Sequence, residues 1–196
     1  MPSAFTPNTC GFLGEPIQSE AGIVIPPDGF LRDAAEICRQ NRVLIMVDEI
    51  QSGLGHMGNC LPMHEGIQAD VMIVGKALAA VSIIRMLASK EILCVFKPGD
   101  HGSTFGGNPL ACAVARAAIR VLIEERLVER SAEQGKYFLK QLRAIRSSAV
   151  KEVRGRGLWI GIELHKQARL YCEALKEQGI LCKETHDRSS ASLLPW

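Results

Sequence analysis

Short, continuous apolar runs constrain the fold of this chain more than any other feature of its sequence. They lie at residues 10–17, 43–47 and 71–74. Between the first two, residues 30–41 (FLRDAAEICRQN) predict a helix whose apolar residues fall on one face: Leu31, Ala34, Ala35 and Cys38. Continuous apolar strands that alternate with a helix are typical of a parallel sheet covered on both faces. The sequence therefore predicts an α/β fold, with residues 82–88 (SIIRMLA) as a further strand.

From Asn108 onward the sequence predicts helices first and strands afterwards. Asn108 suits an N-cap and Pro109 suits the first helical position, so a long Ala-rich helix is expected to begin here. The elements expected after it are a second helix at about 127–146, a strand within 157–164, a helix within 167–179 closed by Gly179, and a short strand at 180–182. This order predicts a smaller α+β unit, joined to the sheet through the long helix.

Composition argues against several classes of protein. The 196 residues carry a net charge of +2 with acidic and basic side chains interspersed, so neither nucleic-acid binding nor membrane binding is expected. No run reaches the roughly 18 apolar residues of a membrane span, and no signal peptide is expected. The seven cysteines are scattered and never spaced C-x-x-C, so no zinc site is predicted. We expect reduced thiols in a cytoplasmic protein, most of them buried as small apolar residues.

Two patterns resemble nucleotide-binding motifs but are incomplete. The apolar run 43–47 ends in Asp-Glu like a Walker B element, yet Gly75-Lys76 lacks the preceding glycine of a P-loop. An ATPase is therefore disfavoured, although a preceding part of a longer protein would be able to carry that loop. Residues 53–58 (GLGHMG) match G-x-G-x-x-G, but polar residues separate them from the strand and no helical pattern follows. A glycine-rich loop is the favoured interpretation of this stretch.

Asp48 and Lys76 stand just beyond two of the apolar runs, at the edge where α/β sheets bind ligands. Burial would lower the pKa of Lys76, which suits a nucleophile that forms a Schiff base. The structural alternative is a lysine whose ammonium reaches water from a strand end. Asp48 shifts the balance, because pyridoxal phosphate needs both a lysine and an acidic partner for its ring nitrogen. Leaving one member of such a buried pair alone costs roughly 3–5 kcal/mol.

Residues 99–110 (GDHGSTFGGNPL) suggest a loop that binds a phosphate. Its glycines allow close backbone approach, and Ser103 and Thr104 offer hydroxyl groups. By itself, the same stretch is equally typical of a surface turn before a helix.

Five segments together resemble class III, fold-type I aminotransferases in order and spacing. They read EPIQSEAG (15–22), VDEIQSGLG (47–55), GKAL (75–78), HGSTFGGNPLACAVA (101–115) and VRGRGL (153–158). The likeness is greatest to ornithine aminotransferases of bacterial type, and CKETHD (182–187) supports that choice. It covers nearly the whole chain but only about the C-terminal half of the family's length. It implies that residues 1–115 are the later part of the large, cofactor-binding domain and that residues 116–196 are a truncated small domain.

The resemblance implies roles for the residues that match family motifs. Lys76 would form the internal aldimine with pyridoxal 5′-phosphate and shuttle a proton between the substrate carbon and the cofactor. Asp48 would pair with the pyridine nitrogen, and Gln51 would hydrogen-bond the phenolic oxygen. Thr104, beside Ser103, would reach the cofactor phosphate of a neighbouring subunit. The family's active sites therefore lie at the interface of a homodimer.

Three glutamates also match family positions. Glu20 corresponds to a glutamate near the substrate that pairs with an arginine in ornithine enzymes. This glutamate–arginine pair acts as a switch in those enzymes, because it lets one site accept first a terminal amine and then the carboxylate of 2-oxoglutarate. The resemblance assigns structural roles to the other two: Glu49 as a hydrogen-bond anchor and Glu15 as a strand-end carboxylate.

The sequence departs from the family pattern in several places. After the lysine, the family has a glycine-rich stretch and a proline. Residues 77–88 of this chain contain neither and are about two residues shorter, so side chains there would crowd Lys76. Residues 55–60 (GHMGNC) replace a Gly-Arg-Thr-Gly pattern. The N-terminal half of the family, which supplies the phosphate cup and the aromatic residue stacked on the ring, has no counterpart in these 196 residues.

The tail RSSASLLPW (188–196) replaces the family's Thr-Val-Ile-Arg-Phe-Ala-Pro-Pro-Leu, whose arginine binds the substrate carboxylate. Deleting one base from a suitable coding sequence for the family version yields this tail residue for residue. We therefore hypothesise a frameshift at codon 188, which resequencing of the DNA would test. If it is present, Arg188 is not the carboxylate-binding arginine, and the last strands of the small domain are missing.

The resemblance implies an ornithine δ-aminotransferase that converts ornithine and 2-oxoglutarate to glutamate semialdehyde and glutamate. The alternatives are an inactive fragment and another class III enzyme, such as an acetylornithine aminotransferase. Exposed sheet edges would favour aggregation or pairing with a complementary chain that supplies the N-terminal half. We expect the chain alone to be inactive.

Overall fold

The computed structural model describes residues 4–58, 66–78, 85–185 and 190–193. They form two compact units. The first comprises Met1–Pro16, Pro27–Leu54 and Leu61–Glu125, and the second comprises Ile17–Pro26, Gly55–Cys60 and Arg126–Trp196. The expected domain boundary after residue 115 lies inside the last helix of the first unit.

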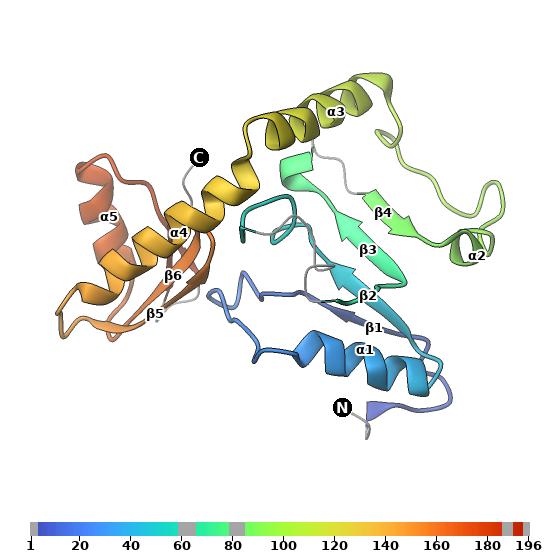
Figure 1. The fold of residues 1–196 in the computed structure, drawn as a ribbon, viewed down its shortest axis with the longest axis horizontal. Coiled ribbons are helices and arrows are strands. Elements are labelled where there is room, and N and C mark those ends of the chain that lie inside the picture. Colours follow the sequence, from blue (N-terminus) through green and yellow to red (C-terminus); the bar gives the residue numbers. More distant parts are fainter. Residues whose placement is uncertain (1–3, 59–65, 79–84, 186–189, 194–196) are drawn as a thin grey trace. The chain divides into compact units, whose positions relative to one another are not determined.

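A four-stranded sheet organises the first unit (Figure 1). Its strands, in spatial order, are β1 (Gly11–Gly14), β2 (Leu44–Asp48), β3 (Val71–Val74) and β4 (Arg85–Ala88). The first three run parallel, as predicted, whereas β4 is antiparallel to β3. The strand predicted at 82–88 is confirmed for its last four residues, and 82–84 lie outside the described residues.

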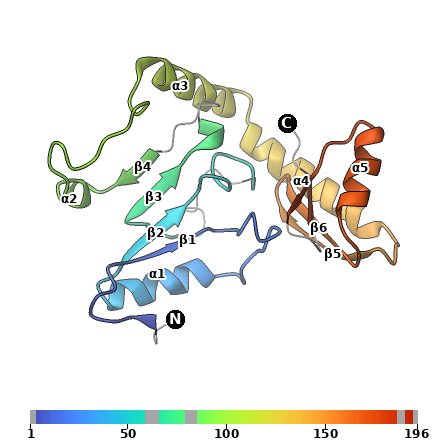
Figure 2. The same cartoon turned by 180° about the vertical axis from the view of Figure 1, so that it is seen from behind.

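Helix α1 (Phe30–Gln40) packs against one face of this sheet, as the views from front and back show (Figures 1 and 2). The four apolar residues predicted to share a helical face are all buried. The core that they help to form contains these buried residues: Leu31, Ala35, Cys38, Val43, Ile45, Val47 and Ile67. The predicted helix and its orientation are therefore confirmed.

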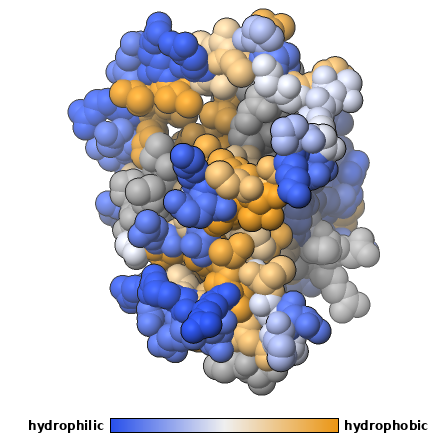
Figure 3. All heavy atoms as spheres, turned by 90° about the vertical axis from the view of Figure 1, so that its right-hand side faces the viewer, coloured by the Kyte–Doolittle hydropathy of each residue, from blue (hydrophilic) through white to orange (hydrophobic). Residues whose placement is uncertain are grey.

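The strand register places Asp48 on the other face of the sheet. Side chains alternate along a strand, so Asp48 points away from the face on which Val47 packs towards α1. Asp48 pairs with Ile73, and Ile73 pairs with Met86, so the three share this face. Met86 is 44% exposed. Figure 3 views the molecule from the side of α2 (Lys90–Leu93) and β4, and it shows hydrophobic residues gathered among hydrophilic ones.

The remaining elements of the first unit follow β3 and β4. A 3-10 helix, η3 (Lys76–Leu78), comes directly after β3, and α3 (Pro109–Glu124) contacts it. Asn108 caps α3, since its Oδ1 accepts the N–H of Ala111 at 2.8 Å, and Pro109 occupies the first turn. Both predictions for the start of this helix are confirmed.

The second unit is an antiparallel sheet with two helices, consistent with the predicted α+β unit. Its elements are α4 (Leu127–Ala144), β5 (Val150–Arg156), β6 (Trp159–Leu164), α5 (Arg169–Glu177), β7 (Lys183–Thr185) and β8 (Ser190–Leu193). The strand order is β5-β6-β8-β7. The strand predicted at 180–182 is wrong: Gly179, with φ +80°, ends the turn after α5, and Ile180 still donates to the carbonyl of Leu175. The paired strand starts at Lys183 instead.

Two glycines bring α4 against the β5–β6 turn. A Cβ on Gly135 would lie 2.0 Å from the carbonyl oxygen of Gly157. A Cβ on Gly157, whose φ is +59°, would lie 2.4 Å from the backbone of Met57. Met57 and Trp159 belong to a buried cluster with Ile17 and Ile23. Helix, turn and the 55–58 segment therefore pack backbone to backbone.

The expectation that most cysteines are buried is wrong for three of the six described: Cys10, Cys94 and Cys112 are exposed. Cys38 and Cys172 are buried, Cys182 is half-buried, and Cys60 lies outside the described residues. Within the part of the chain that the structure describes, no helix combines the length and apolarity needed to cross a membrane.

Candidate functional site

Asp48 and Lys76 follow neighbouring parallel strands at the same edge of the sheet. Asp48 is the last residue of β2, and its register partner on β3 is Ile73. Lys76 comes three residues after Ile73 and opens η3. Neighbouring strands lie about 4.8 Å apart, so both residues start from one short stretch of the carboxyl edge. This is the edge at which open α/β sheets bind ligands.

The backbone beyond β2 holds the Asp48 carboxylate in place. Its Oδ1 accepts the N–H of Ile50 at 2.9 Å, and the residue is half-buried. Glu49 is only 1% exposed, and its Oε2 accepts the hydroxyl of Ser52 at 2.5 Å. A Cβ on Gly53 would lie 2.7 Å from the carbonyl oxygen of Glu49, so the tight turn requires glycine there. These contacts agree with the anchoring role expected for Glu49.

Lys76 adopts an unusual backbone conformation. Its φ is +44°, in the left-handed region that costs a residue with a Cβ roughly 1–2 kcal/mol. Backbone strain of this kind is concentrated at functional sites. Lys76 is exposed at the sheet edge in this chain, as in the structural alternative of a strand-end lysine whose ammonium reaches water. The cost expected for breaking a buried charge pair therefore does not apply here.

Among the described residues, Asp48 and Lys76 form no ion pair with each other. The amine and the carboxylate are thus both available to a third group at the strand ends. A flat heterocycle with an aldehyde and a basic ring nitrogen fits this pair of functional groups. The residues present therefore fit the cofactor that the resemblance implies.

The other predicted cofactor residues of the first unit lie in two loops. Gln51 is half-buried in the turn that follows β2. Ser103 and Thr104 are exposed in the loop before α3, and Ser103 Oγ accepts the N–H of Gly106 at 3.0 Å. Glu15 directly follows β1, the strand beside β2, as expected of a strand-end carboxylate.

Glu20, the predicted substrate residue, belongs to the second unit. It is exposed in a turn closed by two hydrogen bonds between the backbones of Gln18 and Val24. Lys183 Nζ lies 3.3 Å from Glu20 Oε2 and 3.4 Å from Oε1. A lysine of β7 is thus one cation beside this glutamate.

Sequence reasoning missed Lys183 and Arg154. Arg154 lies on β5, a strand that the sequence analysis did not predict, and its Nε donates to the carbonyls of Gly22 and Ile23 at 2.9 and 3.0 Å. Residues 150–156 (VKEVRGR) do not alternate between apolar and charged residues, so a period-two pattern did not indicate this strand.

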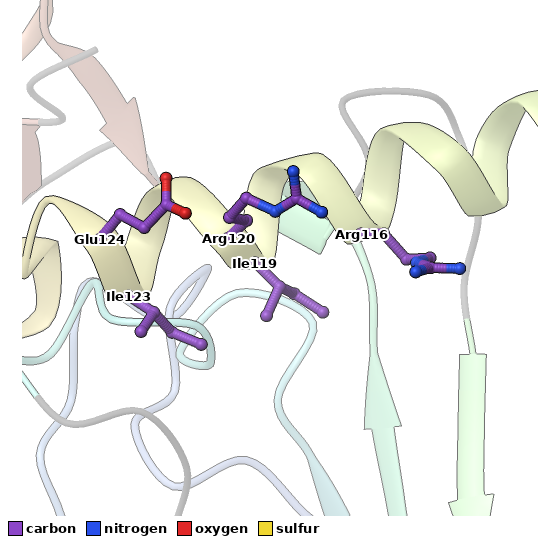
Figure 4. A pocket seen from close by; sticks show the side chains of 5 residues that line it. All are labelled: Arg116, Ile119, Arg120, Ile123 and Glu124. Carbon is purple, nitrogen blue, oxygen red and sulfur yellow. The ribbon is translucent and has the colours of Figure 1, made fainter.

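A shallow hollow of about 320 Å³ runs along α3. Its lining residues are Arg116, Ile119, Arg120, Ile123 and Glu124. Figure 4 shows Ile119 and Ile123 pointing to the same side of the helix. None of the predicted site residues lines this hollow, so the candidate site remains the strand-end pair.

The comparison with protein families matches residues 1–196 to Aminotransferase class-III. Ornithine aminotransferases from Geobacillus sp. (strain WCH70) and Bacillus subtilis (strain 168) are each 58% identical over 187 residues. Each match covers 94% of this chain but 47% of the relative. The chain thus spans about half the length of the curated relatives it matches.

Solved structures give the same result. An ornithine aminotransferase from Plasmodium yoelii is 40% identical with a TM-score of 0.91, covering 95% of this chain and 52% of that one. An acetylornithine aminotransferase from Elizabethkingia anophelis is also 40% identical, with a TM-score of 0.93. That match covers 99% of this chain and 51% of the other.

Proposed function

The chain belongs to the class III aminotransferases, which depend on pyridoxal 5′-phosphate, and from this premise we propose that it carries the cofactor lysine of an ornithine δ-aminotransferase. The observation that supports this most is the placement of Asp48 and Lys76 after neighbouring parallel strands, without an ion pair between them. The reaction would convert ornithine and 2-oxoglutarate to glutamate semialdehyde and glutamate.

Each strand-end residue has a distinct task in this proposal. The cofactor, when bound, supplies a ring that takes up electrons as a substrate C–H bond breaks. Lys76 Nζ would hold the cofactor and would move a proton to and from the substrate carbon. The Asp48 carboxylate would bind the protonated ring nitrogen, and the Ile50 N–H fixes the orientation of that carboxylate.

Gln51, Ser103 and Thr104 orient the cofactor. Gln51 follows Asp48 in the same turn, so its amide is suited to bind the phenolic oxygen. The hydroxyls of Ser103 and Thr104 bind phosphate, with Thr104 serving the site of a neighbouring subunit in a homodimer. Glu20 recognises the amino substrate, and Lys183 supplies the cation that offsets its charge when a carboxylate substrate replaces the amine.

The substrate assignment rests on the ornithine aminotransferases at 58% identity. N-acetylornithine is the second candidate, supported by the acetylornithine aminotransferase with a TM-score of 0.93. Ornithine and N-acetylornithine carry similar reacting groups, so the rates at which the enzyme forms glutamate from each donor must be compared by experiment.

Residues 1–115 and 116–196 correspond, in this proposal, to the later part of a large domain and to a small domain. Leu13 and Met86 are exposed apolar side chains on the sheet face of Asp48. In this proposal a partner chain covers them. That partner is a complementary chain equivalent to the remaining half of the relatives. Alone, the chain is expected to bind cofactor weakly and not to convert substrate. The alternative to the proposed function is a fragment that stays inactive even with a complementary chain.

A reconstitution experiment tests the function. The chain is mixed with cofactor, 2-oxoglutarate and a separately produced polypeptide covering the part of the B. subtilis relative that it does not match. Glutamate formation is then measured with ornithine or N-acetylornithine as the donor. The proposal expects glutamate from ornithine above that from N-acetylornithine, and none with Lys76→Ala. Faster turnover of N-acetylornithine, or equal activity of Lys76→Ala, would contradict it.

A further inference from the structure

Arg154 joins the β5–β6 hairpin to the turn that carries Glu20. Its Nε donates to the carbonyls of both Gly22 and Ile23, and its side chain is only 17% exposed. All of these residues belong to the second unit. A guanidinium removed from water in this way holds its acceptors more firmly than an exposed one.

The guanidinium is itself fixed from the opposite side. Its Nη1 donates to Glu163 Oε2 at 2.5 Å and to Glu152 Oε2 at 2.7 Å. Glu163 also accepts from Lys151 at 2.5 Å. Hydrogen bonds from Lys151 and then Arg154 lower the pKa of Glu163, so this carboxylate remains ionised at neutral pH. Arg154 therefore has little freedom to leave the turn.

The turn needs outside support because its backbone is strained. Gly22 and Ile23 have φ values of +99° and +56°, and Ile23 is fully buried although it is β-branched. On the sheet side there is little spare room: a Cβ on Gly161 would lie 3.2 Å from the Cβ of Ile23. The hydrogen bonds from Arg154 hold the carbonyls of these two strained residues, Gly22 and Ile23.

We propose that Arg154 is a positioning residue for amine recognition: by holding Gly22 and Ile23 it fixes the backbone from which the Glu20 carboxylate projects beside Lys183. The inference rests on the proposed function, since Glu20 is the residue that recognises the amino substrate there. Its consequence is a preference for a substrate with a second amine, such as ornithine, over one with a second carboxylate, such as glutamate.

Lys151 provides a matched control. Like Arg154 it lies on β5 and pairs with Glu163, but its hydrogen bond goes to that carboxylate and not to the turn. Lys151→Gln therefore removes a Glu163 ion pair and leaves the two carbonyl contacts. Arg154→Gln removes those contacts, and Arg154→Lys keeps the charge with a single donor group.

Two measurements are made on the chain. The first is amide hydrogen exchange at Ile23 and Val24, whose N–H groups bond to Ser19 and Gln18. We expect exchange about tenfold faster in Arg154→Gln, as for loss of a hydrogen bond to a charged group, an intermediate rate in Arg154→Lys, and no change in Lys151→Gln. Unchanged exchange in Arg154→Gln, or equal acceleration in Lys151→Gln, overturns the proposal.

The second measurement is made on the cofactor-loaded chain after reconstitution with the complementary polypeptide, and it follows the change in absorbance on adding ornithine or glutamate. Arg154→Gln and Glu20→Gln are both expected to reduce the preference for ornithine about tenfold, while Lys151→Gln keeps it. An unchanged preference in Arg154→Gln overturns the role of Arg154 in substrate recognition.

If Arg154→Gln does not fold, the same criteria apply to Arg154→Lys. If the reconstituted wild-type chain takes up no cofactor, the proposed function and the role of Arg154 in substrate recognition both fail, whereas the exchange rates still decide whether Arg154 holds the turn.

Discussion

The Asp48 carboxylate accepts the N–H of Ile50 at 2.9 Å, which fixes one oxygen at the end of β2. An asparagine would keep this hydrogen bond through its amide oxygen but would lose the charge. Asp48→Asn therefore tests the charge at the site while the hydrogen bond that fixes the turn is kept.

Asp48→Asn is expected to weaken cofactor binding about tenfold or more, because the ring nitrogen loses a charged partner, while stability changes by less than about 0.5 kcal/mol. The measurement is a cofactor titration followed by absorbance, beside urea unfolding. Asp70→Asn is the matched control, since Asp70 Oδ2 accepts the N–H of Ile45 at 2.8 Å away from the site. Equal affinities for the two variants would count against the role of Asp48.

Gly135→Ala is expected to destabilise the second unit by about 1–3 kcal/mol, because the new Cβ overlaps the carbonyl of Gly157. The result would be notable because alanine normally gains about 1 kcal/mol over glycine inside a helix. Gly102→Ala serves as the control, since a Cβ there meets nothing within 4 Å. Thermal unfolding of both variants decides the matter, and a stabilised Gly135→Ala would show that α4 and the turn are not in contact.

His56 is expected to make the second unit less stable in mild acid. Its ring lies edge-on to the buried Trp159, 6.3 Å between centroids, and burial lowers the pKa of His56 from its ordinary value of 6.5. The unfolded chain thus takes up a proton first, so stability is full above pH 6.5 and is lost as pH falls towards the folded pKa. The slope is at most about 1.4 kcal/mol per pH unit. Urea unfolding between pH 5 and about 7 should show this slope in the wild type and a flatter one in His56→Gln.

Cys172 is expected to resist alkylation. Burial, followed by a hydrogen bond with the thiol of Cys182, raises the pKa of Cys172 to about 12. At pH 8 its thiolate fraction is then on the order of a thousandfold below that of an ordinary cysteine. Peptide mapping after brief iodoacetamide treatment should find Cys94 and Cys112, which are exposed, modified well before Cys172. Simultaneous modification would mean that the α5–β7 region opens readily.

The placement of Asp48 and Lys76 at neighbouring strand ends was predictable from sequence, because short apolar runs mark the strands and polar residues mark where they end. Strand β5 was not, because it is an edge strand whose charged side chains pair across the hairpin, as Lys151 does with Glu163, instead of forming an apolar pattern. The start of β7 was misplaced because Ile180 and Leu181 look like a strand but complete the turn after α5.

Burial at the site was the other property that sequence did not supply. The sequence left open whether Lys76 is buried or exposed, because exposure depends on which segments cover the sheet edge and local pattern carries no such information. The positive φ of Lys76 likewise reflects the turn from β3 into η3, not its own propensity.

The most direct test of the account is borohydride reduction of the cofactor-treated chain, followed by proteolysis and mass spectrometry. The account predicts one dominant adduct, on the peptide that contains Lys76, with a lower yield in Asp48→Asn and an unchanged yield in Asp70→Asn. An adduct spread over exposed lysines such as Lys90 and Lys97 with no preference for Lys76, or the same yield in Lys76→Arg, would contradict it.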